Sequence, residues 1–261
     1  MYFFSKLKRK VKGFFEITNT YKNWPIWLLY KVGVINKKIK LYLRKGVSFN
    51  VSERNNLETI DEVWRNKVQI REMELPKNGI IIDIGANIGA FSIMAANELE
   101  SGVVLSYEPE DKNYSALQRN VSDNDLENKI KPIRLAVSNE AGESFLFLGK
   151  ASGYHTLSPS ESANKFTDDK KQVIKTTSLE NIFEENNIIN CAFLKMDCEG
   201  AEKVIILNTD IKYLRRISCM VIECHNGYQE IINHLTENGF EIKLIPHTNK
   251  TGVVYAKLRN L

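Results

Sequence analysis

The stretch Gly79–Gly89, "GIIIDIGANIG", decides the fold. Its first part, 79–85, is a nearly continuous apolar run, and "GAFSIMAANEL" at 89–99 follows with apolar residues at helical spacing. A strand that is apolar at successive positions is buried on both faces, which is typical of a parallel sheet covered by helices on each side. The stretch therefore predicts the first strand, loop and helix of a doubly wound α/β domain.

The same alternation of strands and helices continues along the chain. Further strands are predicted at 102–109, 130–138, 143–149, 191–200 and 217–225, helices at 111–124 and 228–239, and a strand running into a helix over 172–188. The last two apolar runs, 240–245 and 252–258, are joined by a polar turn and predict an antiparallel pair. Together these segments indicate a mostly parallel sheet.

An extension precedes this domain. A hairpin is predicted over 39–51, turning at Lys45 and Gly46, and a helix over 56–75. A length of 261 residues suits one large α/β domain with such an addition. We therefore divide the chain into a basic extension, 1–78, that covers the core, and a ligand-binding domain, 79–261.

Charge is unevenly spread along the chain. Residues 1–40 contain ten Lys and Arg against the single acid Glu16, a charge of +9; because the whole chain carries +4, the remainder carries −5. Residues 4–15 place apolar side chains at helical spacing with basic ones largely opposite. Two interpretations stay open: residues 1–35 contact an anionic membrane peripherally, or they dock on the sheet with a solvated basic face.

Targeting and cysteine patterns indicate a cytoplasmic protein, with the inner membrane face as the place of any peripheral contact. No stretch approaches the roughly 20 apolar residues of a membrane span, and no secretory signal pattern follows the first basic cluster. The four cysteines lack C-x-x-C spacing and lie in or beside apolar runs, which favours reduced core thiols.

The loop after the first strand indicates the ligand. Its glycines, Gly85 and Gly89, are four apart, which does not match the G-x-G-x-x-G spacing of dinucleotide-binding loops. Asp83 supplies an acceptor suited to the ammonium and sulfonium of S-adenosylmethionine. Glu108, at the end of the second strand, is where a carboxylate accepts from two ribose hydroxyls. The alternative is a tight turn with a solvated acid.

At this point the sequence resembles a known family. The segments "IIIDIGANIGAFS", "SYEP", "LQRNVSDN", "TTSLENI", "LKMDCEGAE" and "VIECH" occur in the order seen in the FkbM family of S-adenosylmethionine-dependent methyltransferases, over about 80–225. The resemblance implies a class I methyltransferase fold, a Rossmann-like, mostly parallel seven-stranded sheet with an antiparallel closing strand. It also implies O-methylation of a hydroxyl on a sugar, glycoconjugate or other small molecule.

The resemblance also implies roles for single residues. The methionine side of the cofactor would be lined by Asp83, Gly85, Asn87 and Gly89, the ribose bound by Glu108, and the adenine bordered by Ala136 or Val137. Asn120 and Asn124 match family positions without an assigned ligand.

Four residues are candidates for catalysis. Lys195 and Asp197 alternate onto one face of the fourth core strand, and Glu223 and His225 do so on the fifth. The favoured interpretation is metal-free: His225 is a general base oriented by Glu223 or Asp197. A Mg²⁺ or Mn²⁺ ion held by Asp197, Glu223 and His225 is possible but not favoured, and a structural role is the third alternative.

The neighbouring residues are interpreted differently. Glu199 and Glu202 lie where a helix begins and are expected to hold the turn in shape. His155, in the polar stretch 150–171, is a candidate acceptor contact, whereas His234 and His247 receive no role.

Two other functions compete with small-molecule methylation. An RNA methyltransferase would use the same cofactor, but "DCEG" stands where amino-methylating enzymes carry Asp or Asn before Pro-Pro-Tyr or Pro-Pro-Phe, so nucleic acid is disfavoured. A non-catalytic, membrane-associated module that binds the cofactor is the other alternative.

Overall fold

The computed structural model describes residues 12–147 and 171–259. The N-terminal elements are a helix over 12–20, α2 (Trp24–Lys31), β1 (Ile39–Tyr42), β2 (Ser48–Val51), α3 (Arg54–Ile60), a π-helical turn η1 (Asp61–Asn66) and a 3₁₀ turn η2 (Val68–Ile70). They are followed by β3 (Asn78–Ile84), α4 (Ala90–Glu98), β4 (Ser101–Tyr107), α5 (Asp111–Ser122), β5 (Ile130–Ile133), β6 (Ala136–Ser138), β7 (Gly142–Phe147) and β8 (Lys171–Ser178). The remaining elements are α6 (Leu179–Glu185), β9 (Cys191–Met196), α7 (Glu202–Asn208), α8 (Ile211–Leu214), β10 (Cys219–Cys224), α9 (Gln229–Glu237), β11 (Phe240–Pro246) and β12 (Gly252–Leu258).

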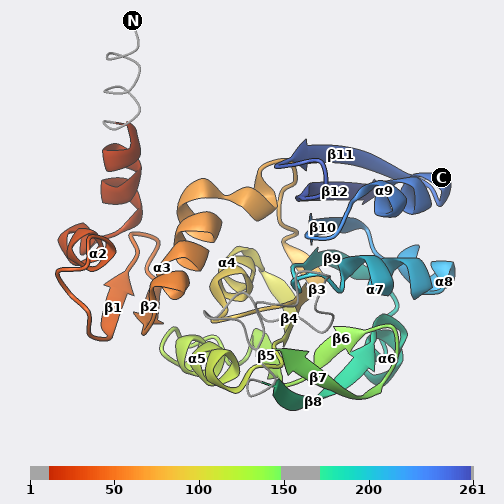
Figure 1. Cartoon of the computed structure of the whole chain (residues 1–261), viewed down its shortest axis with the longest axis horizontal. Coiled ribbons are helices and arrows are strands. Elements are labelled where there is room, and N and C mark those ends of the chain that lie inside the picture. Colours follow the sequence, from red (N-terminus) through yellow and green to blue (C-terminus); the bar gives the residue numbers. More distant parts are fainter. Residues whose placement is uncertain (1–11, 148–170, 260–261) are drawn as a thin grey trace, which may run out of the picture.

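A seven-stranded sheet in the order β11-β12-β10-β9-β3-β4-β5 forms the centre of the molecule (Figure 1). Strand β12 runs antiparallel to both of its neighbours, whereas β10, β9, β3, β4 and β5 pair in parallel. Chain order reverses between β3 and β9, so the carboxyl ends of these strands border the crevice where ligands bind in such folds. The predicted seven-stranded α/β class with an antiparallel closing strand is confirmed.

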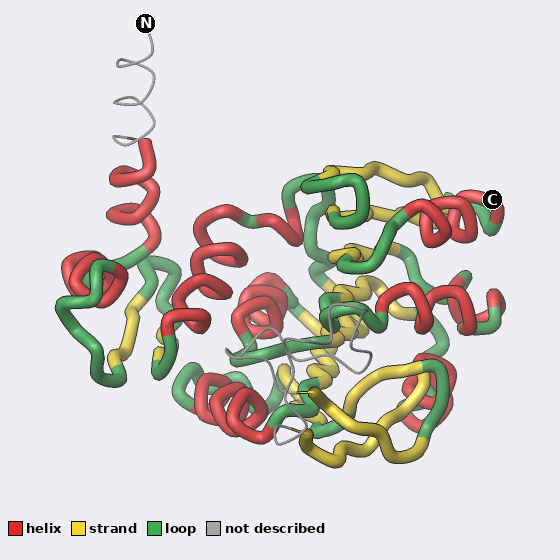
Figure 2. The backbone as a smooth tube through the Cα atoms, in the orientation of Figure 1, coloured by secondary structure: helices red, strands yellow, loops and turns green. Residues whose placement is uncertain are grey.

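Helices cover both faces of this sheet (Figure 2). The alternation of side chains along β3 places Ile81 in one apolar cluster, with residues of α4 and α5, and Ile82 and Ile84 in the other, with residues of α6, α7 and α9. Because both faces are buried, the near-continuous apolar pattern of this strand is explained.

Two predicted elements are interrupted. The single strand expected over 130–138 divides at Arg134 and Leu135: β5 ends the large sheet, and β6 joins β8 and β7 in a separate three-stranded sheet. The helix expected over 56–75 ends at Asn66, because Lys67 adopts a left-handed backbone conformation with φ of 52°.

The predicted hairpin of β1 and β2 docks on α5 through two asparagines. Asn120 accepts from the backbone N–H of Asn50 and donates to the carbonyl of Ile88, and Asn124 exchanges hydrogen bonds with the backbone of Ser48. These two asparagines, for which the sequence suggested no ligand, therefore join the extension to the core. Within the described ranges, no helix is long and apolar enough to cross a membrane.

Candidate functional site

A pocket lies beyond the carboxyl ends of β3, β4 and β9. Its lining residues come from the first loop, the end of β4, the start of β6 and the segment after β9: Ile84, Gly85, Asn87, Tyr107, Glu108, Pro109, Asn113, Leu135, Ala136, Val137, Leu146, Asp197, Cys198 and Glu199. Most of the residues predicted to bind a cofactor are therefore brought together here. We call it the first pocket.

The glycines of the first loop are required by packing against the protein itself. Gly85 has φ of 74°, and a Cβ there would lie 1.8 Å from the carbonyl oxygen of Asp197. Gly89 has φ of 86°, and its Cβ would lie 2.6 Å from Leu117 Cδ1. The absent side chains thus leave room for the end of β9 at Gly85 and for α5 at Gly89.

Glu108 is a buried carboxyl at the edge of the first pocket. Its two oxygens accept from the backbone N–H groups of Asn87, at 2.8 Å, and Glu110, at 3.0 Å. Burial raises the pKa of Glu108, and these two hydrogen bonds lower it, leaving a pKa of about 7. The carboxylate thus fixes the first loop and still borders the space where hydroxyl donors would be received.

Asp83 and Lys195 form an ion pair within the sheet. They are direct neighbours across β3 and β9, and Lys195 Nζ lies 3.3 Å from Asp83 Oδ1 and 3.7 Å from Asp197 Oδ2. Nζ also donates to the carbonyl of Gly85 at 2.8 Å, and Asp83 Oδ2 accepts from Ser92 Oγ at 2.5 Å. Asp83 is fully buried and does not line the first pocket, so its effect on a ligand there is exerted through Lys195 and the loop.

A second pocket adjoins the first. Asn87, Asp197 and Glu199 line both, so the two spaces meet at these side chains. The remaining lining residues come from α3, η1, η2, the start of α4 and the ends of β9 and β10: Asn55, Glu58, Thr59, Glu62, Val63, Gln69, Ala86, Phe91, Lys195, Glu223 and His225. Among the described residues, five carboxyl groups, one lysine and one histidine line this pocket.

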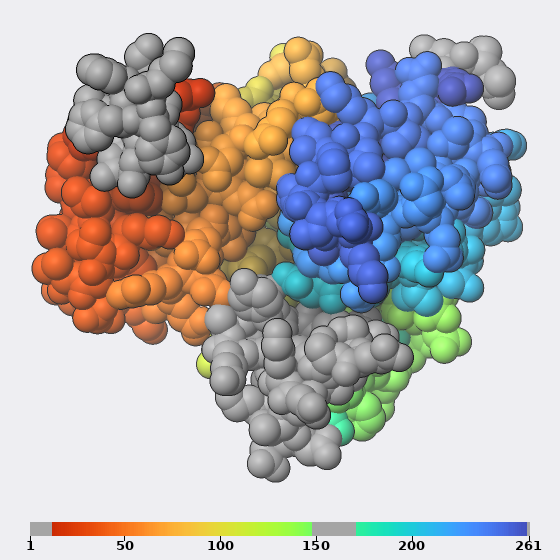
Figure 3. All heavy atoms as spheres, turned by 45° about the horizontal axis from the view of Figure 1, so that its top comes forward, coloured from red at the N-terminus to blue at the C-terminus, as the bar shows by residue number. Residues whose placement is uncertain are grey.

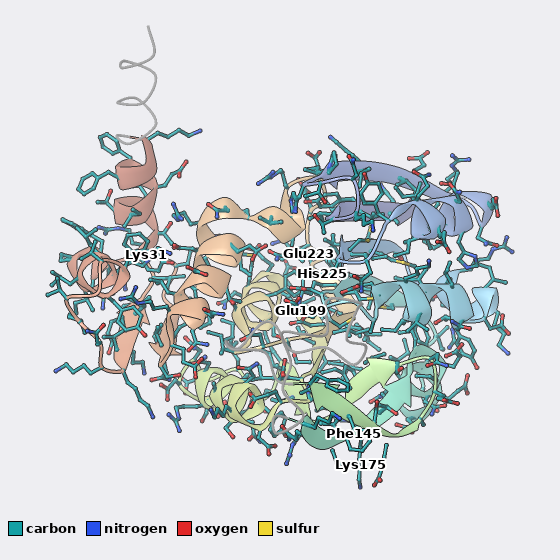
Figure 4. The ribbon with its side chains drawn as sticks, in the orientation of Figure 1. Lys31, Phe145, Lys175, Glu199, Glu223 and His225 are labelled. Atoms are coloured by element: carbon teal, nitrogen blue, oxygen red, sulfur yellow. The ribbon has the colours of Figure 1, made fainter. Side chains whose placement is uncertain are left out.

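His225 lies among carboxylates at the wall of the second pocket (Figure 4). Its Nδ1 is 3.0 Å from Glu202 Oε1, and its Nε2 is 3.6 Å from Glu199 Oε2 and 3.9 Å from Asp197 Oδ1. Burial alone would lower the pKa of His225, but the hydrogen bond to Glu202 and the surrounding negative charges raise it to about 10. The imidazole is therefore protonated at neutral pH, which argues against its predicted use as a general base.

Two carboxyl groups, unlike the protonated imidazole of His225, are suited to accept a proton. Burial raises the pKa of Glu199 to about 8, and burial together with the charges of Asp197 and Glu62 raises that of Glu223 to about 8. A carboxyl with such a pKa is a far stronger base than an ordinary one and is still partly ionised near neutral pH.

Glu202 and Glu199 have different surroundings although they were predicted to act alike. Glu202 is buried and accepts from the backbone N–H groups of Cys198 and Gly200, so it holds the turn before α7 as expected. Glu199 precedes the helix with a φ of 54° and lines both pockets. Its predicted role in shaping the turn is therefore corrected.

The residues that could hold a metal differ from the predicted set. Asp197, Glu199 and His225 offer ligand atoms within 4.8 Å of one another, whereas Glu223, in the predicted set, does not belong to this group. A cation at this place would have to displace the proton of His225, because the imidazole ligates a metal only in its neutral form. The structure therefore changes the metal alternative from Asp197, Glu223 and His225 to Asp197, Glu199 and His225.

Comparison with known proteins identifies the family. A family model described as the methyltransferase FkbM domain matches residues 83–242, more than half of the chain. The chain belongs to the FkbM methyltransferase family. As a member of this family it is a methyltransferase. Of the residues that the resemblance assigns to S-adenosylmethionine, Gly85, Asn87, Glu108, Ala136 and Val137 line the first pocket.

Individual relatives are distant. The chain is 26% identical over 196 residues to methyltransferase sdnD of Sordaria araneosa, covering 64% of this chain and 76% of that protein. It is 23% identical over 210 residues to the 31-O-demethyl-FK506 methyltransferase FkbM of Streptomyces tacrolimicus, covering 69% and 80%. A solved FkbM methyltransferase from Methylobacillus flagellatus matches 77% of this chain and 52% of its own, about half its length, with a TM-score of 0.49 and 15% identity.

Several pocket residues were not predicted from the sequence. Glu58, Glu62 and Gln69 come from the extension, which no motif connects to the core, and only the folded chain places them opposite β10. Of the histidines, His155 lies outside the described residues, and His234 and His247 line neither pocket.

Proposed function

We propose that this FkbM methyltransferase transfers a methyl group to a hydroxyl of a sugar, a glycoconjugate or another small molecule held in the second pocket. The observation that carries the proposal is the meeting of the two pockets at Asn87, Asp197 and Glu199. A cofactor in the first pocket and an acceptor in the second would approach each other at these side chains, as direct transfer requires.

The chain's own residues would prepare the acceptor oxygen. When bound in the first pocket, S-adenosylmethionine would supply the methyl group from its sulfonium and would leave as S-adenosylhomocysteine. Glu199, which lines both pockets, accepts the hydroxyl proton. Protonated His225, held by Glu202, keeps Glu199 and Asp197 in place through charge. Lys195 ties Asp197 to the first loop.

Two features support a small neutral acceptor. One relative's name states that it methylates 31-O-demethyl-FK506, a compound named for an oxygen that lacks its methyl group. The carboxylates of the second pocket would repel the phosphates of a nucleic acid, so RNA is disfavoured as an acceptor.

The direct test combines binding with turnover. Calorimetry with S-adenosylmethionine is followed by detection of S-adenosylhomocysteine formed in the presence of a panel of sugars, glycoconjugates and hydroxylated small molecules. Asp197→Ala is expected to abolish turnover and to change cofactor affinity less than threefold. Tight binding by the wild type without turnover on any acceptor would instead support a non-catalytic module.

The base is identified by pH dependence. Because Glu199 acts in its ionised form and has a pKa of about 8, kcat should rise with pH and level off above about 8. Glu199→Gln should lose at least 100-fold in kcat, in the range of a general base. Glu223→Gln is the matched control, since Glu223 has a similar pKa but lines the second pocket alone; it should retain the pH profile. A kcat that rises until pH 10 would identify His225 as the base.

A further inference from the structure

Exposed apolar side chains are concentrated on the N-terminal elements. Among the described residues, twelve large apolar side chains are exposed, and eight of them lie between residues 14 and 42. We call these eight the apolar face: Phe14, Phe15, Ile26, Leu28, Leu29, Val32, Val34 and Tyr42. Scattered exposed apolar residues are normal on a protein surface, but such a concentration marks an interaction site.

Helix α2 is apolar on its inward and outward sides. Trp27 and Tyr30 are buried against the extension, where Trp27 Nε1 donates to the buried carboxylate of Asp61. On the remaining surface of the same helix, Leu28 and Leu29 are each 40% exposed, and Ile26 is also exposed. A helix that is apolar all round is normally buried, and the described residues bury only one side of α2.

The helix over 12–20 extends this face. Phe14 packs edge-on against Trp24, with ring centroids 5.2 Å apart, and this contact joins the helix to the start of α2. Phe15, beside it, is 60% exposed. In Figure 3 the N-terminal elements, in red, form one flank of the molecule, apart from the C-terminal strands in blue.

Positive charge is concentrated in the same part of the chain as the apolar face. Residues 12–45 contain eight Lys and Arg and the single acid Glu16, a net charge of +7. Lys22, Lys37 and Lys38 are exposed, and none of them forms an ion pair with a described residue. Lys40 lies over the ring of Tyr42, with Nζ 6.0 Å from its centroid. Exposed apolar and cationic groups thus lie on the same N-terminal elements.

We propose that the apolar face docks this methyltransferase on the surface of an anionic lipid bilayer. Burial of Leu28, Leu29 and their neighbours among the acyl chains would remove apolar surface from water, while the lysines contact the lipid phosphates. Self-association is a poorer explanation, because an isologous contact would bring the exposed Lys22, Lys37 and Lys38 of two copies together.

The face and the second pocket lie on neighbouring helices. Lys31, the last residue of α2, is paired at 3.2 Å with Glu58 of α3, and Glu58 lines the second pocket. Figure 4 shows Lys31 on the N-terminal elements and Glu199, Glu223 and His225 near the centre of the molecule. Docking would hold α2 at the membrane, with Glu58 beside it and Glu199, Glu223 and His225 farther away, near the centre of the molecule.

Vesicle co-sedimentation of the full chain tests the proposal. We expect the wild type to bind vesicles of phosphatidylcholine with one quarter phosphatidylglycerol, and to bind pure phosphatidylcholine at least tenfold more weakly. Leu28→Gln with Leu29→Gln keeps a helix-compatible residue at each position and should lower the partition coefficient on the anionic vesicles at least tenfold. Lys37→Gln with Lys38→Gln should lower it about fivefold or more and weaken its dependence on salt.

A matched control separates this surface from exposed apolar residues in general. Val204, on α7, is 39% exposed, a fraction similar to the 40% of Leu28 and Leu29. Ile189 is 76% exposed. Ile189→Gln with Val204→Gln should bind vesicles as the wild type does. Equal vesicle binding by the Leu28 and Leu29 variant would overturn the proposal, as would a wild type that does not bind. A wild type that forms dimers in light scattering, with dimers lost in that variant and no vesicle binding, would assign the face to self-association instead.

Discussion

Gly85 lacks a side chain at the place where the first loop crosses the end of β9. Gly85 has a φ of 74°, and a Cβ at this position would lie 1.8 Å from the Asp197 carbonyl oxygen, so there is no space for a methyl group. Gly85→Ala is therefore expected to displace Asp197 or the loop and to lower the free energy of unfolding by about 3 kcal/mol or more. Urea denaturation measures this loss, and cofactor affinity should fall with it because both segments line the first pocket.

Gly46 provides a control for backbone conformation alone. It has a φ of 89°, and a Cβ there would meet nothing within 4 Å. Gly46→Ala should lower the free energy of unfolding by only about 1 kcal/mol, the cost of a left-handed alanine. Equal losses in the two variants would show that the close approach to Asp197 has no energetic consequence.

Glu108 makes cofactor affinity depend on pH. Its pKa of about 7 in the free protein is raised by burial, and ribose hydroxyls that donate to it would stabilise the ionised form. Binding then requires loss of a proton below pH 7, so the Kd for S-adenosylhomocysteine should fall as pH rises from 5.5 to 7.5 and be constant above. Calorimetry in buffers of different ionisation enthalpy would detect the released proton.

The same carboxyl also contributes to the pH dependence of folding. Because its folded pKa lies above the ordinary value of 4.5, its contribution to the free energy of unfolding is most favourable below that value and is lost as pH rises towards 7.

The variant Glu108→Gln tests the role of this carboxyl in cofactor binding. It should bind the cofactor more weakly and reduce the slope of affinity against pH. A variant that keeps the full slope would assign the titration to another group.

At the scale of elements, sequence patterns predicted the segments whose structure depends on residues nearby in the chain. The strands β3 and β9 were predicted from apolar runs, and the role of Glu202 in holding the turn was predicted from its position at the start of α7. Glu199 was misassigned, because its φ of 54° turns it into the pockets and no pattern encodes that angle. The break at Lys67 and the separation of β6 from β5 also depend on tertiary packing, which local propensity does not contain.

Asn120 joins three elements by hydrogen bonds that have no local pattern. Its side chain is fully buried. It accepts a hydrogen bond from the backbone N–H of Asn50 in β2 and donates one to the carbonyl of Ile88 in the first loop. Asn120→Ala leaves both backbone groups without these partners and should lower the free energy of unfolding by about 3 kcal/mol. Chemical denaturation checks this value. Asn208→Ala, which removes an exposed bond within α7, should change it by less than about 0.5 kcal/mol.

The whole molecule separates its charges between two surfaces. Residues 12–45 carry +7, whereas the second pocket presents five carboxylates against Lys195 and His225. The extension contributes to both: α2 bears the apolar face, and α3 and η1 place Glu58 and Glu62 in the pocket wall. Binding to anionic lipid and rejection of anionic acceptors are therefore compatible in one chain, because opposite potentials act at different sites.

The acidic pocket should select acceptors by charge. For any hydroxyl compound that the enzyme methylates, its phosphate monoester, with a second hydroxyl left free, should have a kcat/KM at least tenfold lower above pH 8, because the dianion meets the carboxyl groups of Glu58, Glu62 and Glu223 and the last of these is ionised there. Burial also raises the pKa of Glu62, so its negative charge grows with pH. Glu62→Gln should narrow the difference between the two acceptors, as should added salt. Equal kcat/KM values for both acceptors in the wild type would mean that the acceptor is bound outside the second pocket.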